Sequence, residues 1–220
     1  TCVQNLLREG IPRGRIHFTG HPIVDVLKSL EEKINTKRLS KFEVKPYEYY
    51  LVTLHRRDNI EHRRKLAEFL QTFEEIQRSN PSYKLIFPIH PHTRKMVKKY
   101  NLQKLLKSVT LTEPLGYLDT LSLIKFAKVV LTDSGGIQQE AALLRTPCIT
   151  LRERTEWTET IECGVNFLAY TTEQILNTLK KIEKEYCRIS KNFTKAQHIF
   201  GSPPISEKII KILLGSLVKV

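Results

Sequence analysis

The sequence has little cysteine, no long apolar run and no initiating methionine. Its four cysteines (Cys2, Cys148, Cys163 and Cys187) show no metal-ligand spacing. No apolar stretch approaches the roughly 20 residues that span a bilayer, and the first residues of the sequence do not have the pattern of a secretory signal. We therefore expect a protein of the reducing cytoplasm, without a membrane segment or metal site, and we interpret the abrupt opening as the interior of a longer chain.

Common signatures of nucleotide and nucleic-acid binding are also missing. The sequence contains neither the dinucleotide fingerprint G-x-G-x-x-G nor the Gly-Lys-Ser/Thr of a P-loop. Zinc-finger spacing, RNA-binding aromatic motifs and basic zippers are absent as well. The net charge of +13, from 36 basic and 23 acidic residues, favours anionic partners such as nucleotide phosphates. Solvated lysines on helix faces would explain the charge equally simply, so we do not expect nucleic acid as a partner.

Apolar runs alternate with helical patterns along the chain. The expected strands lie at about 15–18, 49–54, 84–89, 109–111, 129–131, 147–151 and 166–169. Most are continuous apolar runs rather than alternating ones, which predicts a parallel sheet buried on both faces by helices. The fold class is therefore α/β, with a doubly wound, Rossmann-like sheet. We expect one domain over residues 1–220, with a core at about 15–186 and a helical tail at 187–220.

Polar residues and glycines collect where the predicted strands end. In open parallel sheets, ligands bind outside the carboxyl ends of the strands. Six separate strand ends bring such residues to one edge, which favours a functional site there. These residues are Gly20, His55, His90, Glu113, Asp133 with Ser134, and Arg152.

The stretch KVVLTDSGGIQQE, residues 128–140, is the most informative. It predicts a buried strand, a tight turn and a helix that Asp133 or Ser134 caps. Gly135 and Gly136 allow backbone to approach a ligand closely, and the helix start suits a phosphate. Glu140, one turn later, could accept hydrogen bonds from a sugar hydroxyl. An ordinary capped helix without a ligand would give the same pattern.

Two other strand ends carry cations. His55-Arg56-Arg57-Asp58 could bind phosphate and move a proton; alternatively, Asp58 is an N-cap and the arginines are solvated. Arg152 and Arg154 could reach a diphosphate or could pair with the glutamates that follow them.

His90-Pro91-His92 raises the question of a metal site. Two histidines two positions apart diverge at a strand end, and no third ligand stands nearby in sequence. We therefore expect no metal.

Taken in order, six stretches resemble the non-hydrolysing UDP-N-acetylglucosamine 2-epimerase family. They are GHPIVD (20–25), LVTLHRRDN (51–59), PIHP (88–91), LTEPLGY (111–117), LTDSGGIQQE (131–140) and LRERTEWTE (151–159). The resemblance implies the C-terminal half of a two-domain, glycosyltransferase-B-type architecture, with substrate in the cleft between the domains. The family's N-terminal domain, which carries the carboxylates for proton transfer, has no counterpart in the sequence. Family members are usually homodimers and need no cofactor.

The resemblance also implies roles for individual residues. UDP would lie on Ser134, Gly135 and Gly136, with Glu140 on the ribose. His55 and Asp58 would be catalytic, and Arg152 or Arg154 would face the pyrophosphate. His90 and Arg56 would belong to a regulatory substrate site.

Several positions depart from the family pattern. Asp58 stands where Glu is usual, His21 where Asn is usual and Thr120 where an aromatic residue is frequent, and Trp157 replaces a frequent Arg. The implied reaction inverts C2 of UDP-GlcNAc to give UDP-ManNAc, by elimination and re-addition of UDP. The alternatives are a hydrolysing epimerase, a glycosyltransferase of the same architecture and a non-catalytic nucleotide-sugar binding module.

Overall fold

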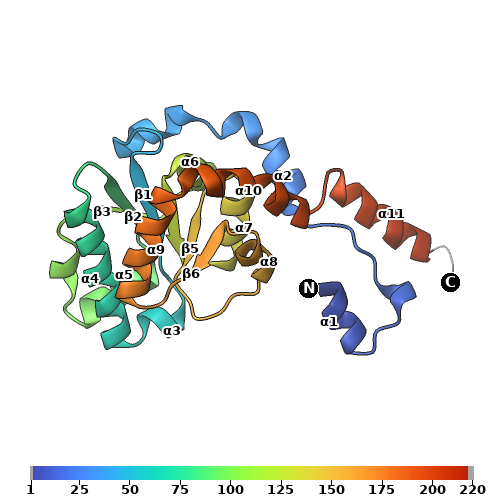
Figure 1. Cartoon of the computed structure of the whole chain (residues 1–220), viewed down its shortest axis with the longest axis horizontal. Helices are drawn as coiled ribbons and strands as arrows, with labels where there is room; N and C mark the ends of the chain where they lie inside the picture. Colours follow the sequence, from blue (N-terminus) through green and yellow to red (C-terminus); the bar gives the residue numbers. More distant parts are fainter. Residues whose placement is uncertain (1, 218–220) are drawn as a thin grey trace.

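A computed structural model describes residues 2–217 and contains a six-stranded parallel sheet (Figure 1). The strand order is β3-β2-β1-β4-β5-β6, with Leu51 of β1 opposite Ile86 on one side and Val130 on the other. The strands are β1 (Tyr49–Thr53), β2 (Lys84–Pro88), β3 (Thr110–Thr112), β4 (Val129–Thr132), β5 (Cys148–Thr150) and β6 (Asn166–Leu168). The order reverses between β1 and β4, as in doubly wound sheets, so the predicted fold class is confirmed.

Helices cover both faces of the sheet. The α-helices are α1 (Cys2–Arg8), α2 (Ile23–Ser29), α3 (Arg57–Ile60), α4 (Arg63–Ser79), α5 (Pro91–Lys99), α6 (Tyr117–Phe126), α7 (Gly135–Leu143), α8 (Thr158–Glu162), α9 (Thr172–Lys184), α10 (Tyr186–Ile199) and α11 (Ile205–Leu217). Short 3₁₀ turns span η1 (Arg13–Arg15), η2 (Glu31–Lys33), η3 (Thr36–Phe42) and η4 (Gln103–Leu106). No helix among residues 2–217 is long and apolar enough to cross a membrane.

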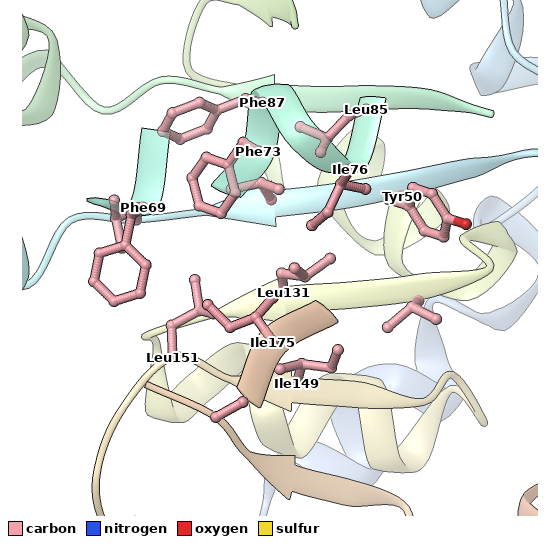
Figure 2. Packing of buried hydrophobic residues seen from close by; sticks show 14 of the residues in the cluster. Tyr50, Phe69, Phe73, Ile76, Leu85, Phe87, Leu131, Ile149, Leu151 and Ile175 are labelled. Atoms are coloured by element: carbon pink, nitrogen blue, oxygen red, sulfur yellow. The ribbon is translucent and has the colours of Figure 1, made fainter. Parts of the chain in front are cut away.

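The continuous apolar runs of the strands explain the two layers. Successive strand residues point to opposite faces, so Tyr50 packs with one core cluster and Tyr49 with another. Figure 2 shows the first cluster, where Phe73 of α4 lies against Phe87 of the sheet and Ile76 of α4 lies near Tyr50. The second cluster joins the other face to α6, α7 and η3. A sheet buried on both faces presents its strand ends as the free edge for a site.

The expected strand at 15–18 is wrong. Arg15 ends the turn η1, and residues 16–18 have no regular structure. Phe18 is 75% exposed, so this segment lacks the two-sided burial of the central strands β1 and β4. A strand also needs a neighbour to satisfy its backbone groups, and none pairs with it among the described residues.

The packed core continues past residue 186. α10 contributes Ile189, Phe193 and Ala196 to the cluster of Figure 2, and Phe200 is buried as well. α11 extends away from the sheet at the same end of the molecule as α1 (Figure 1). Residues 218–220 of the expected tail lie outside the described residues.

Candidate functional site

Asp133, fully buried at the end of β4, ties three strand ends together. Its carboxylate accepts hydrogen bonds from the backbone N–H of His55 at 3.0 Å and of Arg56 at 2.8 Å, and from Asn59 Nδ2 at 3.0 Å. Asn59 also donates to the Leu151 carbonyl at 3.1 Å. The loops after β1, β4 and β5 are therefore fixed relative to one another. The sequence places Asp133 at this strand-end edge and offers it as a helix cap, but it predicts neither these contacts nor the part played by Asn59.

His55 is oriented by the same carboxylate. Its Nδ1 lies 3.2 Å from Asp133 Oδ1, and its side chain is 39% exposed. An imidazole held through Nδ1 keeps Nε2 for a ligand, and the buried carboxylate favours the Nδ1–H tautomer. His55 is thus a fixed, accessible group at the sheet edge.

The start of α7 has the predicted cap. Ser134 Oγ accepts from Ile137 N at 3.5 Å, and the Ser134 N–H donates to Thr132 Oγ1 at 3.0 Å. Gly135 and Gly136 form the first turn of α7. Their bare backbone and the helix dipole make an anion-binding end.

Glu140 lies one turn into α7 and is only 9% exposed. Burial raises the pKa of its carboxyl group, and a hydrogen bond from the Tyr117 hydroxyl partly opposes that rise. Tyr117 is the first residue of α6. The acid is therefore an acceptor in a largely apolar place, held from the neighbouring helix.

Arg56 and Arg152, two of the four arginines that the sequence places at these strand ends, both lie near Glu156 at the start of α7. Arg152 Nη1 lies 2.8 Å from Glu156 Oε2, and Arg56 Nη2 lies 4.0 Å from Glu156 Oε1. Of the two alternatives for Arg152, pairing with a following glutamate is the arrangement present. Arg154 lines a neighbouring recess of about 250 Å³ together with Asp58.

The alternative in which Asp58 caps a helix is wrong. Arg56 is the N-cap residue of α3, and Asp58 lies exposed in its first turn. The backbone N–H groups of His55 and Arg56 in this loop donate to Asp133 instead. The Asp58 side chain faces solvent.

His90 caps α5 through its own side chain. Its Nδ1 accepts from the His92 backbone N–H at 3.2 Å, while its ring centroid is 5.8 Å from that of His55. The two histidines line a mainly apolar cavity of about 180 Å³, and Thr120 lines it as well. Within residues 2–217, no group of three or more His, Cys, Asp or Glu side chains could hold a metal ion.

Comparisons with known proteins identify the family of this chain. The family model described as UDP-N-acetylglucosamine 2-epimerase matches residues 1–214. The chain belongs to this family. A UDP-N-acetylglucosamine 2-epimerase of Methanocaldococcus jannaschii is 39% identical over 217 residues, which are 95% of this chain and 57% of the relative. The chain therefore spans little more than half the length of that curated relative.

Two solved structures with a similar fold show how this chain relates to larger proteins. The crystal structure of the M. jannaschii UDP-GlcNAc 2-epimerase in complex with UDP-GlcNAc and UDP gives a TM-score of 0.77 at 35% identity, covering 96% of this chain and 58% of that one. The C-terminal domain of a group 1 glycosyltransferase from Francisella tularensis shares the fold alone, with a TM-score of 0.55 at 11% identity over 74% of this chain and 89% of that domain. The epimerase-family chain thus has the Rossmann-like fold of the C-terminal half of a glycosyltransferase-B-type protein.

Within this epimerase-family chain, some site residues were not predictable from sequence alone. Tyr117 belongs to the LTEPLGY stretch, yet nothing in that stretch shows its contact with Glu140. Glu156 was noticed only as a partner for arginines, whereas its Oε1 would lie 2.2 Å from a Cβ built on Gly135. Both contacts arise between elements that the fold brings together.

Proposed function

We propose that this chain is the UDP-binding half of a non-hydrolysing UDP-GlcNAc 2-epimerase. The observation that carries the proposal is the start of α7, where the Ser134 hydroxyl and the backbone N–H groups of Gly135 and Gly136 lie near Arg56 and Arg152. A diphosphate fits this combination of helix dipole, free N–H groups and guanidinium forks. The cited relative and its complex with UDP-GlcNAc and UDP support the same assignment.

The ribose and the uracil of the nucleotide would bind next to that anion site. Glu140 accepts from the ribose hydroxyls, and Tyr117 holds its carboxylate in position. The apolar cavity between His55 and Ile137 is of a size to receive the uracil ring. Arg154, beside Arg152 in sequence, adds a second cation for the pyrophosphate.

The proposed reaction proceeds through loss of UDP. The C2–H bond breaks as a base takes the proton, a C1–C2 double bond forms, and the C1–O bond breaks with its electron pair leaving on the β-phosphate. The product pair is UDP and 2-acetamidoglucal. Re-addition of UDP at C1, with protonation of C2 on the opposite face, gives UDP-ManNAc without a redox change or cofactor.

This half supplies the groups for the leaving anion. His55, held by Asp133 through Nδ1, donates from Nε2 to the departing phosphate in its doubly protonated form, and the donors of α7 stabilise the negative charge of that phosphate. We assign Asp58 a catalytic role on family resemblance, although it is exposed here. The base at C2 would come from an N-terminal domain of the family type, so we expect the present chain alone to be inactive.

Other proposals concern the assembled enzyme. We propose a homodimer in the cytoplasm, where the four cysteines, all free in the structure, would stay reduced. His90 and Arg56 form a regulatory site for a second nucleotide sugar, beside the first. A full-length protein should release UDP-ManNAc, whereas free ManNAc as the product would identify the hydrolysing branch.

Calorimetric titration of the 220-residue chain with UDP tests the binding half. We expect saturable binding that Ser134→Ala weakens about tenfold and Glu140→Ala about 10- to 100-fold, through loss of one neutral or one charged hydrogen-bond partner. Gln139→Ala, next to Glu140 on the same helix, is the matched control and should leave the affinity unchanged. UDP binding that is equally strong in all four proteins would place the nucleotide elsewhere.

A further inference from the structure

The indole N–H of Trp157 is a buried donor without an acceptor. Among residues 2–217, Trp157 Nε1 is the only buried side-chain nitrogen or oxygen that lacks a hydrogen-bond partner. A donor in this state has a free-energy cost, and such groups in native proteins need an explanation. Trp157 is also the only tryptophan of the 220 residues.

Packing fixes the direction of this donor. The Trp157 ring lies 5.4 Å from the Phe200 ring and 5.8 Å from the His21 ring, between centroids. Trp157 precedes the first turn of α8, and its backbone N–H donates to Thr155 Oγ1 at 3.1 Å. The indole is therefore held in place and not a freely turning surface group.

The donor borders the start of α7. A Cβ built on Gly135 would lie 3.7 Å from Trp157 Nε1 and 2.2 Å from Glu156 Oε1. The Glu156 carboxylate thus covers the first backbone unit of α7, directly beside the indole nitrogen. A carboxylate of the chain itself, that of Glu156, thus lies at the helix start where the phosphate of a ligand is expected.

Glu156 is held there by weak interactions. It pairs with Arg152 at 2.8 Å and lies 4.0 Å from Arg56, yet its side chain is 47% exposed. Burial pushes the pKa of its carboxyl group upward, but hydrogen bonds from its own backbone N–H and from Arg152 hold that pKa below the usual value. Exposed ion pairs contribute little to stability, so a diphosphate that carries more charge can compete for both arginines.

We propose that a bound diphosphate displaces the Glu156 carboxylate from Gly135, and that Trp157 Nε1–H then donates a hydrogen bond to one of its phosphate oxygens. This inference rests on the proposed function, because it requires the diphosphate to lie at the start of α7. Trp157 becomes a ligand-binding residue at the position where the family frequently has Arg. A neutral, pre-oriented donor takes over part of the role of a cation, and the orphan N–H gains its acceptor only when the ligand is present.

A titration of the ¹⁵N-labelled chain tests this directly, because one tryptophan gives one indole N–H signal. With UDP, we expect a downfield shift of the indole proton, together with shifts of the Gly135 and Gly136 amides. Uridine, which lacks phosphate, should leave the indole signal in place. Glycine amides that shift with UDP while the indole signal does not would overturn the inference and leave the proposed function standing. If none of these signals responds to millimolar UDP, both are overturned.

Two variants complete the test by calorimetry. Trp157→Phe keeps an aromatic ring against Phe200 but removes the donor, so we expect UDP affinity to fall about five- to tenfold, the effect of one hydrogen bond, while uridine affinity and the melting temperature of the free chain stay the same. Glu156→Gln removes the competing anion and should raise UDP affinity several-fold. A Trp157→Phe variant that binds UDP as tightly as the parent, or a Glu156→Gln variant that binds it more weakly, would contradict the proposal.

Discussion

Single residues in the strand-end loops divide sharply by burial, and their expected effects differ accordingly. Asp133 and Asp58 are both carboxylates near the proposed diphosphate. Asp133 is fully buried and serves three N–H donors in addition to the His55 ring, whereas Asp58 is exposed in the first turn of α3. The same side-chain chemistry is therefore structural at one position and available to substrate at the other.

Asp133→Ala should destabilise the chain by about 3 kcal/mol, because it leaves several buried donors without an acceptor. Equilibrium unfolding in urea, monitored by circular dichroism, measures the change. Asp58→Ala is the matched control, and as an exposed substitution it should change the unfolding free energy by less than about 0.5 kcal/mol. Equal effects of the two substitutions would show that the Asp133 network does not hold the loops.

The residues that sequence reasoning found are those whose chemistry is local. Ser134, Gly135 and Gly136, three consecutive positions, predict a helix start with a side-chain cap and little side-chain cover, and the cap is present. Of the two cap candidates Ser134 is the cap, and the hydrogen bonds of Asp133 were not predictable because its partners, His55 and Asn59, are more than 70 positions away in sequence. The unpaired nitrogen of Trp157 was invisible for the same reason, since no pattern reveals that an atom lacks a partner.

At the scale of elements, the contact between α6 and α7 limits how far burial raises the pKa of Glu140. Burial raises the pKa of Glu140, and the hydrogen bond from Tyr117 opposes the rise. An acid with a raised folded-state pKa contributes stability below its unfolded pKa, and loses that contribution as pH rises through the folded value. Tyr117 limits this loss because it stabilises the charged carboxylate.

Tyr117→Phe should therefore make the chain less stable above the Glu140 pKa, by about 1–2 kcal/mol for a hydrogen bond to a charged group. The difference from the parent should narrow at acidic pH, where Glu140 is protonated in both proteins. Melting temperatures measured across pH provide the check. As a control, Tyr117→Phe is also introduced into a chain that carries Glu140→Gln. A pH-dependent effect of Tyr117→Phe that persists in the Glu140→Gln background would assign it to another group.

Elements were predicted well where a run of apolar residues marks a strand buried on both faces. β1, β2, β4 and β5 coincide with such runs, because continuous burial leaves a continuous apolar signature. The edge strands β3 and β6 are only partly buried and carry a weaker signature. The error at 15–18 has a different origin. Ile16 and Phe18 form an alternating pair that would suit an edge strand, but whether a sheet edge accepts them depends on the assembled fold and not on the segment.

At the scale of the whole molecule, the two ends of the chain differ from the sheet domain between them. α1 has no buried residue, and the apolar side chains Ile210, Leu213 and Leu214 of α11 are each more than half exposed. The start of α11 is anchored, because Ile205 is buried and Asp25 of α2 accepts from the Ile205 and Ser206 N–H groups at 3.1 and 2.6 Å. An apolar face of this kind is a surface for association.

Removal of residues 208–220 should change stability little and solubility more. Hydrophobic stabilisation follows the apolar area removed from water, and none of the side chains described at 208–215 is buried. The melting temperature should stay within about 2 °C of the parent, since a loss of 1 kcal/mol shifts a chain of this size by only about 2–4 °C, while light scattering should detect less self-association at high protein concentration. Ile205→Ala in the intact chain is the contrasting variant and should lower the melting temperature by several degrees, because it empties a buried position. A truncated chain that unfolds as easily as the Ile205→Ala variant would show that the exposed half of α11 contributes to the fold.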